Sequence, residues 1–168
     1  MSHKVQIKWI TVTGVAVFVA DQISKAIVIA NLDPGTPFRS DTFFYFVHQR
    51  NSGLIGGAFA DYPFVTYLAP LLATAILFYI ARHLDPNSHW QRIGYGMLLG
   101  GAFGNLLDRI RLQAVTDFLQ FHFYFIPFDF PWKFYPAFNI ADSGILVGVS
   151  ILVFSWSGDV RDNVPSTS

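Results

Sequence analysis

The chain contains neither cysteine nor glutamate among its 168 residues. Without cysteine, disulfides, thiolate metal ligands and a cysteine nucleophile are all excluded. Charged residues make up only 13% of the chain, whereas soluble domains carry about 25%. The 11 basic residues balance the 11 acidic ones, so the net charge of zero does not indicate a nucleic-acid partner. This shortage of charge, together with 52% hydrophobic residues and 18 Phe, predicts an integral membrane protein.

Four segments have the roughly 20 mainly apolar residues that a membrane-spanning helix needs. They lie at about residues 9–32, 62–81, 90–109 and 137–157. Residues 33–61 contain turn-forming positions, then a β-prone run and several glycines, so we expect a small strand-containing cap there. We therefore predict a mainly α membrane protein with a single integral membrane domain over residues 1–168.

Residues 113–136 are rich in aromatic side chains but are not expected to form a fifth span. Pro127, Pro131 and Pro136 would break a helix. Asp129 and Lys133 would also be stranded in lipid. Because aromatic side chains favour the membrane–water boundary, we predict an interfacial segment that lies on the membrane. A loop that only packs on the helix ends is the open alternative.

The polar residues of the predicted spans converge on one face of the membrane. With four spans, the end of the first, the end of the third and the start of the fourth lie on the same side. The polar residues at these three points are Asp21 and Lys25, then Asn105, Asp108 and Arg109, then Asn139 and Asp142. Asp117 lies in the connection between the last two spans. Each side carries five Lys or Arg, so the positive-inside rule does not identify this face.

Two spacings in the spans predict structure. Asp21 and Lys25 are four residues apart, so they form a helical i,i+4 pair that we interpret as mainly structural. Glycines recur every four residues in the third and fourth spans, at Gly96, Gly100, Gly104, Gly144 and Gly148. Small residues at this spacing let membrane helices approach closely. We therefore expect the third and fourth helices to pack tightly, which would bring Asn105 near Asn139.

Asp117 and Asp142 are the candidate catalytic residues. An ionisable group within a span is costly, so Asp142 indicates a functional site. Two carboxylates in apolar surroundings tend to hold one proton between them. The ionised one can take a proton from water while the protonated one donates to a carbonyl oxygen, which is general acid–base hydrolysis. The alternative is that Asp142 is a buried hydrogen-bond hub and Asp117 a loop cap. The histidines lack metal-ligand spacing, so neither a metal site nor a cofactor is expected.

Four blocks of sequence, taken in order, resemble the lipoprotein signal peptidase (signal peptidase II) family of bacterial membrane aspartic proteases. They are Asp21-Gln22-Ile23-Ser24-Lys25, Gly100-Gly101-Ala102-Phe103-Gly104-Asn105-Leu106-Leu107-Asp108-Arg109, Val115-Thr116-Asp117-Phe118 and Pro136-Ala137-Phe138-Asn139-Ile140-Ala141-Asp142. The resemblance implies four transmembrane helices with a small extracytoplasmic β cradle. It also implies that Asp117 and Asp142 are the catalytic pair, and that Asn105, Asp108, Arg109 and Asn139 support it.

The resemblance implies a substrate and a location as well. The family cleaves signal peptides from prolipoproteins just before a cysteine that carries a diacylglyceryl group. The expected partners are thus a lipid-modified prolipoprotein and membrane lipids, with the chain itself a monomer. The expected location is the bacterial cytoplasmic (inner) membrane, with the active site extracytoplasmic and both termini cytoplasmic.

The chain departs from the family pattern at two places. The block from Asn51 to Phe59 is longer than the usual one, although Asn51 remains a candidate supporting residue. Gln113 stands where a glycine usually precedes the first catalytic Asp, which predicts a change in the local backbone. Two other functions remain open at this point. They are a small ion- or proton-coupled transporter, because intramembrane Asp and Lys also mark ion paths, and an inactive relative that acts as a scaffold.

Overall fold

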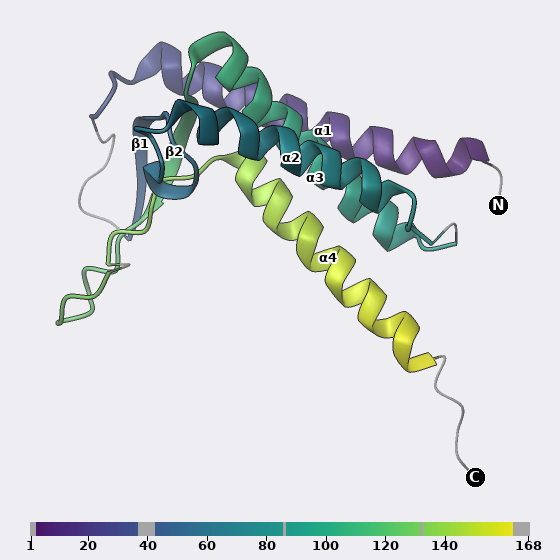
Figure 1. Ribbon diagram of the computed structural model, residues 1–168. Helices are drawn as coiled ribbons and strands as arrows, with labels where there is room; N and C mark the ends of the chain where they lie inside the picture. Colours follow the sequence, from purple (N-terminus) through teal and green to yellow (C-terminus); the bar gives the residue numbers. More distant parts are fainter. Residues whose placement is uncertain (1–2, 37–42, 86, 132, 163–168) are drawn as a thin grey trace.

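The computed structural model is mostly helical, with one small two-stranded sheet, and is shown in Figure 1. It describes residues 3–36, 43–85, 87–131 and 133–162. The elements in chain order are α1 His3–Asn31, β1 Phe44–Asn51, a short 3-10 turn at Ile55–Gly57, α2 Pro63–Ala81, α3 His89–Leu112, β2 Val115–Phe121 and α4 Ile140–Asp162. The four helices coincide closely with the four predicted apolar segments.

Two of these helices meet the length and hydropathy expected of a membrane span. Among the described residues, they are α1 over Ile7–Asn31 and α2 over Phe64–Ala81. The apolar part of α4, Ile140–Trp156, is shorter. In α3, five glycines and several charged residues lower the hydropathy. The crossing of the membrane by α3 and α4 therefore stays a prediction.

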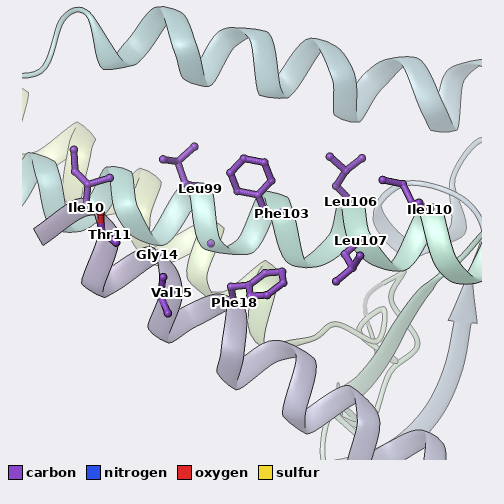
Figure 2. A pocket seen from close by; sticks show the side chains of 11 residues that line it. Ile10, Thr11, Gly14, Val15, Phe18, Leu99, Phe103, Leu106, Leu107 and Ile110 are labelled. Carbon is purple, nitrogen blue, oxygen red and sulfur yellow. The ribbon is translucent and has the colours of Figure 1, made fainter. Parts of the chain in front are cut away.

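The outer surface of α1 and α3 is apolar. A shallow groove of about 510 Å³ runs between them, and Thr11 is the one lining residue with a polar side chain. Figure 2 shows Phe18 of α1 and Phe103 of α3 among the side chains that border it. Val15 and Leu71, on α1 and α2, are each more than half exposed. Such a surface is what contact with lipid requires, since a soluble surface rarely exposes so large an apolar area.

Glycines allow close helix packing, although not on the faces that the sequence predicted. A methyl group added at Gly96 would meet the backbone oxygen of Ile10 in α1 at 2.6 Å. The stripe that Gly96 begins therefore faces α1 rather than α4. The contact with α4 uses another face of α3, where an added methyl group at Gly101 would collide with the carbonyl oxygen of Ala141. The prediction that α3 and α4 pack tightly is confirmed, but the residues assigned to that contact were partly wrong.

The two strands join segments that the sequence analysis assigned to different parts of the molecule. β1 and β2 pair antiparallel from Phe44 opposite Phe121 to Asn51 opposite Val115. The register shifts between Phe46 and Gln49. A strand in the predicted cap, residues 33–61, is confirmed, although residues 37–42 of that range lie outside the described residues. Its partner strand, residues 115–121, lies in the predicted interfacial segment, so the sheet joins the two predicted regions.

The chain after β2 folds back on itself before α4 begins. Backbone N–H groups of Phe123 and Tyr135 donate to the carbonyl oxygens of Lys133 and Phe121, at 2.8 and 2.9 Å. Phe138 likewise bonds to Leu119 at 2.8 Å. In Figure 1 the sheet lies at the end of the bundle where α1 and α3 end and α4 begins, and the folded-back segment continues from the far end of its strands. This end of the bundle gathers the polar residues.

α3 ends in a conformation that is unusual for its sequence. Gln113 caps the helix with φ 58° and ψ 13°, in the left-handed region, and its N–H donates to the carbonyl of Arg109 at 3.1 Å. Glycine is the usual residue there because it has no Cβ to clash. The left-handed conformation at Gln113 turns the chain directly into β2.

Candidate active site

A buried ionic cluster ties α1 to α3 beneath the sheet. The Nζ atom of Lys25 lies 2.8 Å from Oδ2 of Asp21 and 3.0 Å from Oδ2 of Asp108. All three side chains are buried. Because buried charges are stable only when paired, Lys25 holds both carboxylates in place. The predicted Asp21–Lys25 pair is thus confirmed and enlarged by Asp108.

Each carboxylate of this cluster also holds the start of another element. Oδ1 of Asp21 accepts the backbone N–H of Ala141 at 2.9 Å, in the first turn of α4. Oδ2 of Asp108 accepts the backbone N–H of Thr116 at 3.0 Å, in β2. These are the two elements that carry the candidate catalytic residues. The cluster therefore positions Asp117 and Asp142 through the backbone next to each.

Gln22 belongs to the same cluster, and the sequence analysis missed it. Its Nε2 lies 3.1 Å from Oδ2 of Asp21, 3.2 Å from Oδ1 of Asp108 and 3.3 Å from the carbonyl oxygen of Gly104. A polar amide inside a predicted span is itself a signal, since such groups need partners in lipid.

Asn105 connects the ionic cluster to Asp142. Lys25 donates to Oδ1 of Asn105 at 3.0 Å. An ammonium group can only donate, so the amide oxygen of Asn105 must face Lys25 and its NH₂ group must face the other way. The Nδ2 of Asn105 accordingly donates to Oδ1 of Asp142 at 2.8 Å. Lys25 thus sets the direction of a hydrogen bond that ends on a candidate catalytic carboxylate.

Asn139 links the two candidate catalytic residues. Its Nδ2 donates to Oδ1 of Asp117 at 2.8 Å and to Oδ1 of Asn105 at 3.1 Å. Its Oδ1 accepts the backbone N–H of Asp142 at 2.9 Å. The sequence predicts a fourth span from about residue 137, but α4 begins at Ile140, so Asn139 is the N-cap residue. The predicted approach of Asn105 and Asn139 is confirmed.

Asn51 completes the surroundings of Asp117. Its Nδ2 donates to Oδ2 of Asp117 at 3.0 Å and to the carbonyl of Leu54 at 2.9 Å. Its Oδ1 accepts the N–H of Gly53 at 3.0 Å, which fixes the amide direction. Arg109 donates to the carbonyl of Gly53 at 3.1 Å, and so ties the end of α3 to this loop. The longer block after Asn51 therefore leaves Asn51 in contact with the candidate site.

Every oxygen of the two carboxylates accepts one hydrogen bond. Those of Asp117 face Asn51 and Asn139, and those of Asp142 face the side chain of Asn105 and the backbone N–H of Asn139. Asp117 is buried, whereas Asp142 is partly exposed. The remaining lone pairs can bind a proton, a water molecule or a substrate amide.

The environment of Asp117 suits proton transfer near neutral pH. Burial raises the pKa of Asp117 to about 7, and the charge of Asp142 adds to this rise. The hydrogen bonds from Asn51 and Asn139 oppose it, because they favour the ionised form. A group with this pKa can either hold or accept a proton at physiological pH. Among the described residues, no three His or Asp side chains are grouped as metal ligands.

Comparison with known proteins gives concordant matches. The family described as Signal peptidase (SPase) II matches residues 13–157. A lipoprotein signal peptidase of Shewanella woodyi is 36% identical over 145 residues, covering 83% of this chain and 77% of the relative. One from Syntrophotalea carbinolica is 32% identical over 165 residues, covering 93% and 96%. A solved structure of a bacterial membrane enzyme has the same fold, with a TM-score of 0.74 at 23% identity over 99% of this chain and 95% of the other.

Proposed function

The chain belongs to the signal peptidase II family, and we propose that it cleaves the signal peptides of diacylglyceryl-modified prolipoproteins. It is a membrane protease by family, and its relatives carry the name lipoprotein signal peptidase. The observation that supports an aspartic mechanism is the link through Asn139. This one residue donates to Asp117 by its amide and to Asp142 by its backbone N–H.

We propose a single chemical sequence for the pair. The ionised carboxylate takes a proton from a water molecule, and the water oxygen attacks the scissile carbonyl carbon. The protonated carboxylic acid donates its proton to the carbonyl oxygen, so a neutral tetrahedral diol forms. The aspartate that is now protonated then gives its proton to the leaving nitrogen as the carbon–nitrogen bond breaks. The other, now ionised, takes a proton from one hydroxyl of the diol, so the pair again holds one proton. This is general acid–base hydrolysis without a covalent intermediate.

We further propose that α3 and α4 cross the membrane together with α1 and α2. The support is their length, 24 and 23 residues, because a span needs about 20. Both helices also pack closely on each other, and α3 packs on α1. In this arrangement both termini are cytoplasmic, and the sheet and the aspartates face the extracytoplasmic side of the bacterial inner membrane. The substrate's acyl chains remain in the bilayer, and one monomer forms the whole site.

The transporter alternative is less well supported. A relay across the membrane needs ionisable groups spaced along its depth. Among the described residues, the buried carboxylates Asp21, Asp108 and Asp117 instead belong to one connected cluster at one end of the bundle. The intact pair of aspartates also argues against an inactive scaffold.

The deciding experiment is cleavage of a diacylglyceryl-modified prolipoprotein by the purified protein. Asp117→Asn and Asp142→Asn should each abolish cleavage while the protein keeps its unfolding temperature. Asp129→Asn is the matched control, because Asp129 is an exposed carboxylate that pairs with Lys133 and not with the cluster, and it should cleave as the wild type does. Full activity in either of the first two variants, or loss of activity on treatment with a metal chelator, would contradict the mechanism.

A further inference from the structure

Large aromatic side chains cover the segment that follows β2. Residues 122–131 and 133–135 are called the aromatic hairpin here, because its two arms are joined by the backbone hydrogen bonds given above. Five of its rings are exposed, namely Tyr124, Phe125, Phe128, Phe134 and Tyr135. Phe125 and Phe128 are 63% and 65% exposed. A surface facing water rarely gathers so many large apolar side chains, so an apolar partner is expected.

Ring contacts within the hairpin hold these side chains in fixed directions. The centroid of Phe43, next to β1, lies 5.3 Å from that of Phe123 and 6.0 Å from that of Phe125. Phe123 in turn lies 6.2 Å from Phe130. These separations fall in the range at which aromatic pairs attract each other. The exposed rings are therefore presented by a braced element rather than by a loose loop.

The charges of the hairpin favour a boundary location over the bilayer core. Lys133 donates to Oδ1 of Asp129 at 2.9 Å, and the side chain of Asp129 is 96% exposed. This pair leaves the hairpin without net charge from these two groups. A charged pair in the hydrocarbon core would be costly, whereas in the headgroup layer both groups stay hydrated. The hairpin thus combines exposed aromatic rings with a hydrated ion pair, which is the combination that the interfacial layer of a membrane accommodates.

The position of the hairpin in the molecule agrees with this. α2 enters its apolar span at Pro63, and the rings of Tyr62 and Phe64 beside it are 63% and 74% exposed. Exposed aromatic rings at the start of a span mark the membrane boundary. In Figure 1 the hairpin continues from the far end of the strands, at an angle to the common direction of α1, α2 and α3. Such a direction extends it along a membrane surface rather than out into water.

We propose that the aromatic hairpin inserts its rings into the interfacial layer of the membrane and thereby fixes the depth of β2. The hairpin is the direct continuation of β2, the strand that carries Asp117. Holding the hairpin at the boundary therefore holds this carboxylate at a constant depth. The partner is the lipid bilayer itself, and the anchoring is apolar rather than electrostatic.

The absence of cysteine makes this depth directly measurable, since one introduced cysteine can carry a label without any background substitution. Phe125→Cys would be labelled with an environment-sensitive fluorophore and the protein reconstituted into phosphatidylcholine vesicles. Lipids with a quencher high on the acyl chain and lipids with a quencher near the chain end would be compared. Two matched references are Leu72→Cys in the middle of α2, and Asn87→Cys in the exposed connection between α2 and α3.

The label at position 125 should show blue-shifted emission and stronger quenching by the shallow quencher than by the deep one. The label at position 72 should show the reverse order, and the label at position 87 should emit as in water with no quenching. A label at 125 that behaves like the one at 87 would overturn the proposal. So would quenching at 125 that follows the order seen at 72. The measurement needs no substrate, so a failure of the peptidase assignment would leave its result intact.

Discussion

Asn139 and Asp142 hydrogen-bond to each other twice across the first turn of α4. The side-chain oxygen of Asn139 accepts the backbone N–H of Asp142, and the side chain of Asp142 accepts the backbone N–H of Asn139, at 2.9 and 3.2 Å. This is the reciprocal arrangement of a capping box, with Asp in place of the usual Glu or Gln. The same residues that begin the helix therefore also orient a candidate catalytic carboxylate.

Substitutions at Asn139 should separate the cap from the catalytic contact. In Asn139→Ser the hydroxyl oxygen can still accept from the N–H of residue 142, but the donor to Asp117 is lost. We expect nearly unchanged stability and at least about a tenfold loss in kcat/KM, because a hydrogen bond to a charged group is worth about 1.5–3 kcal/mol. Asn139→Ala should lose activity and also about 1 kcal/mol of stability.

Thermal unfolding and cleavage assays in detergent give both quantities. Equal activity in Asn139→Ser and the wild type would refute the link to Asp117.

Lys25 should be required both for folding and for the direction of the Asn105 amide. Lys25→Met leaves Asp21 and Asp108 buried without a counter-charge, which should cost about 3–5 kcal/mol of unfolding free energy. The double variant Lys25→Met/Asp21→Asn restores the net charge of the cluster. Asparagine at position 21 also retains an oxygen for the N–H of Ala141.

The double variant distinguishes a positioning role from simple charge balance. Its stability should recover in large part, but its kcat should stay low, because only the neutral amide of Asn139 then donates to the oxygen of Asn105 and the charged donor is lost. The measurements are chemical unfolding in mild detergent and separate values of kcat and KM. If the double variant recovered kcat along with stability, Lys25 would serve charge balance alone.

The plot of kcat/KM against pH should contain a limb, meaning a rise or fall, near pH 7 that is due to titration of Asp117. Burial raises the pKa of this group to about 7, and the hydrogen bond from Asn51 lowers it by favouring the ionised form. Asn51→Ala removes that bond, so the pKa should rise further and the limb should move to higher pH by about one unit. Arg50→Ala, at the exposed neighbouring position in β1, is the control and should leave the limb unchanged.

The side on which this limb falls assigns the roles within the pair. If Asp117 carries the proton in the active form, kcat/KM falls as the pH rises through the limb. If Asp117 is the base, kcat/KM falls as the pH drops through it. In either case the limb moves upward in Asn51→Ala. A limb that stayed fixed, or moved to lower pH, would show that it belongs to another group.

Much of the candidate site could be predicted from the sequence because successive spans cross the membrane in alternating directions. Polar residues at the ends of alternate spans must meet on one face, and Asp21, Lys25, Asn105 and Asp142 do meet there. Gln22 was missed because a neutral amide carries a weaker signal than a charge. Two of its three possible partners, Gly104 and Asp108, are distant in the sequence.

The sheet partner and the glycine contacts could not be predicted in the same way. β2 has an aromatic-rich continuation, and its pairing with β1 depends on a contact across more than 60 residues, which no local pattern specifies. Glycines 96 and 101 lie on different faces of one helix. The spacing of a glycine stripe shows that a close contact exists, but it does not identify the neighbouring helix.

Gln113 offers a stabilising substitution that leaves the candidate site untouched. Its φ of 58° lies in the left-handed region, where a Cβ atom costs about 1–2 kcal/mol relative to glycine. Gly also has greater freedom in the unfolded chain, which offsets part of this gain. Gln113→Gly should therefore raise the unfolding free energy by about 1 kcal/mol, with kcat/KM unchanged. Gln113→Val should lower it, because a β-branched side chain suits this conformation least.

Gln113→Ala is the matched control for loss of the side chain beyond Cβ and should stay close to the wild type. Denaturant unfolding of the three variants ranks them, and a Gly variant less stable than the Ala variant would mean that the turn into β2 does not need the left-handed conformation.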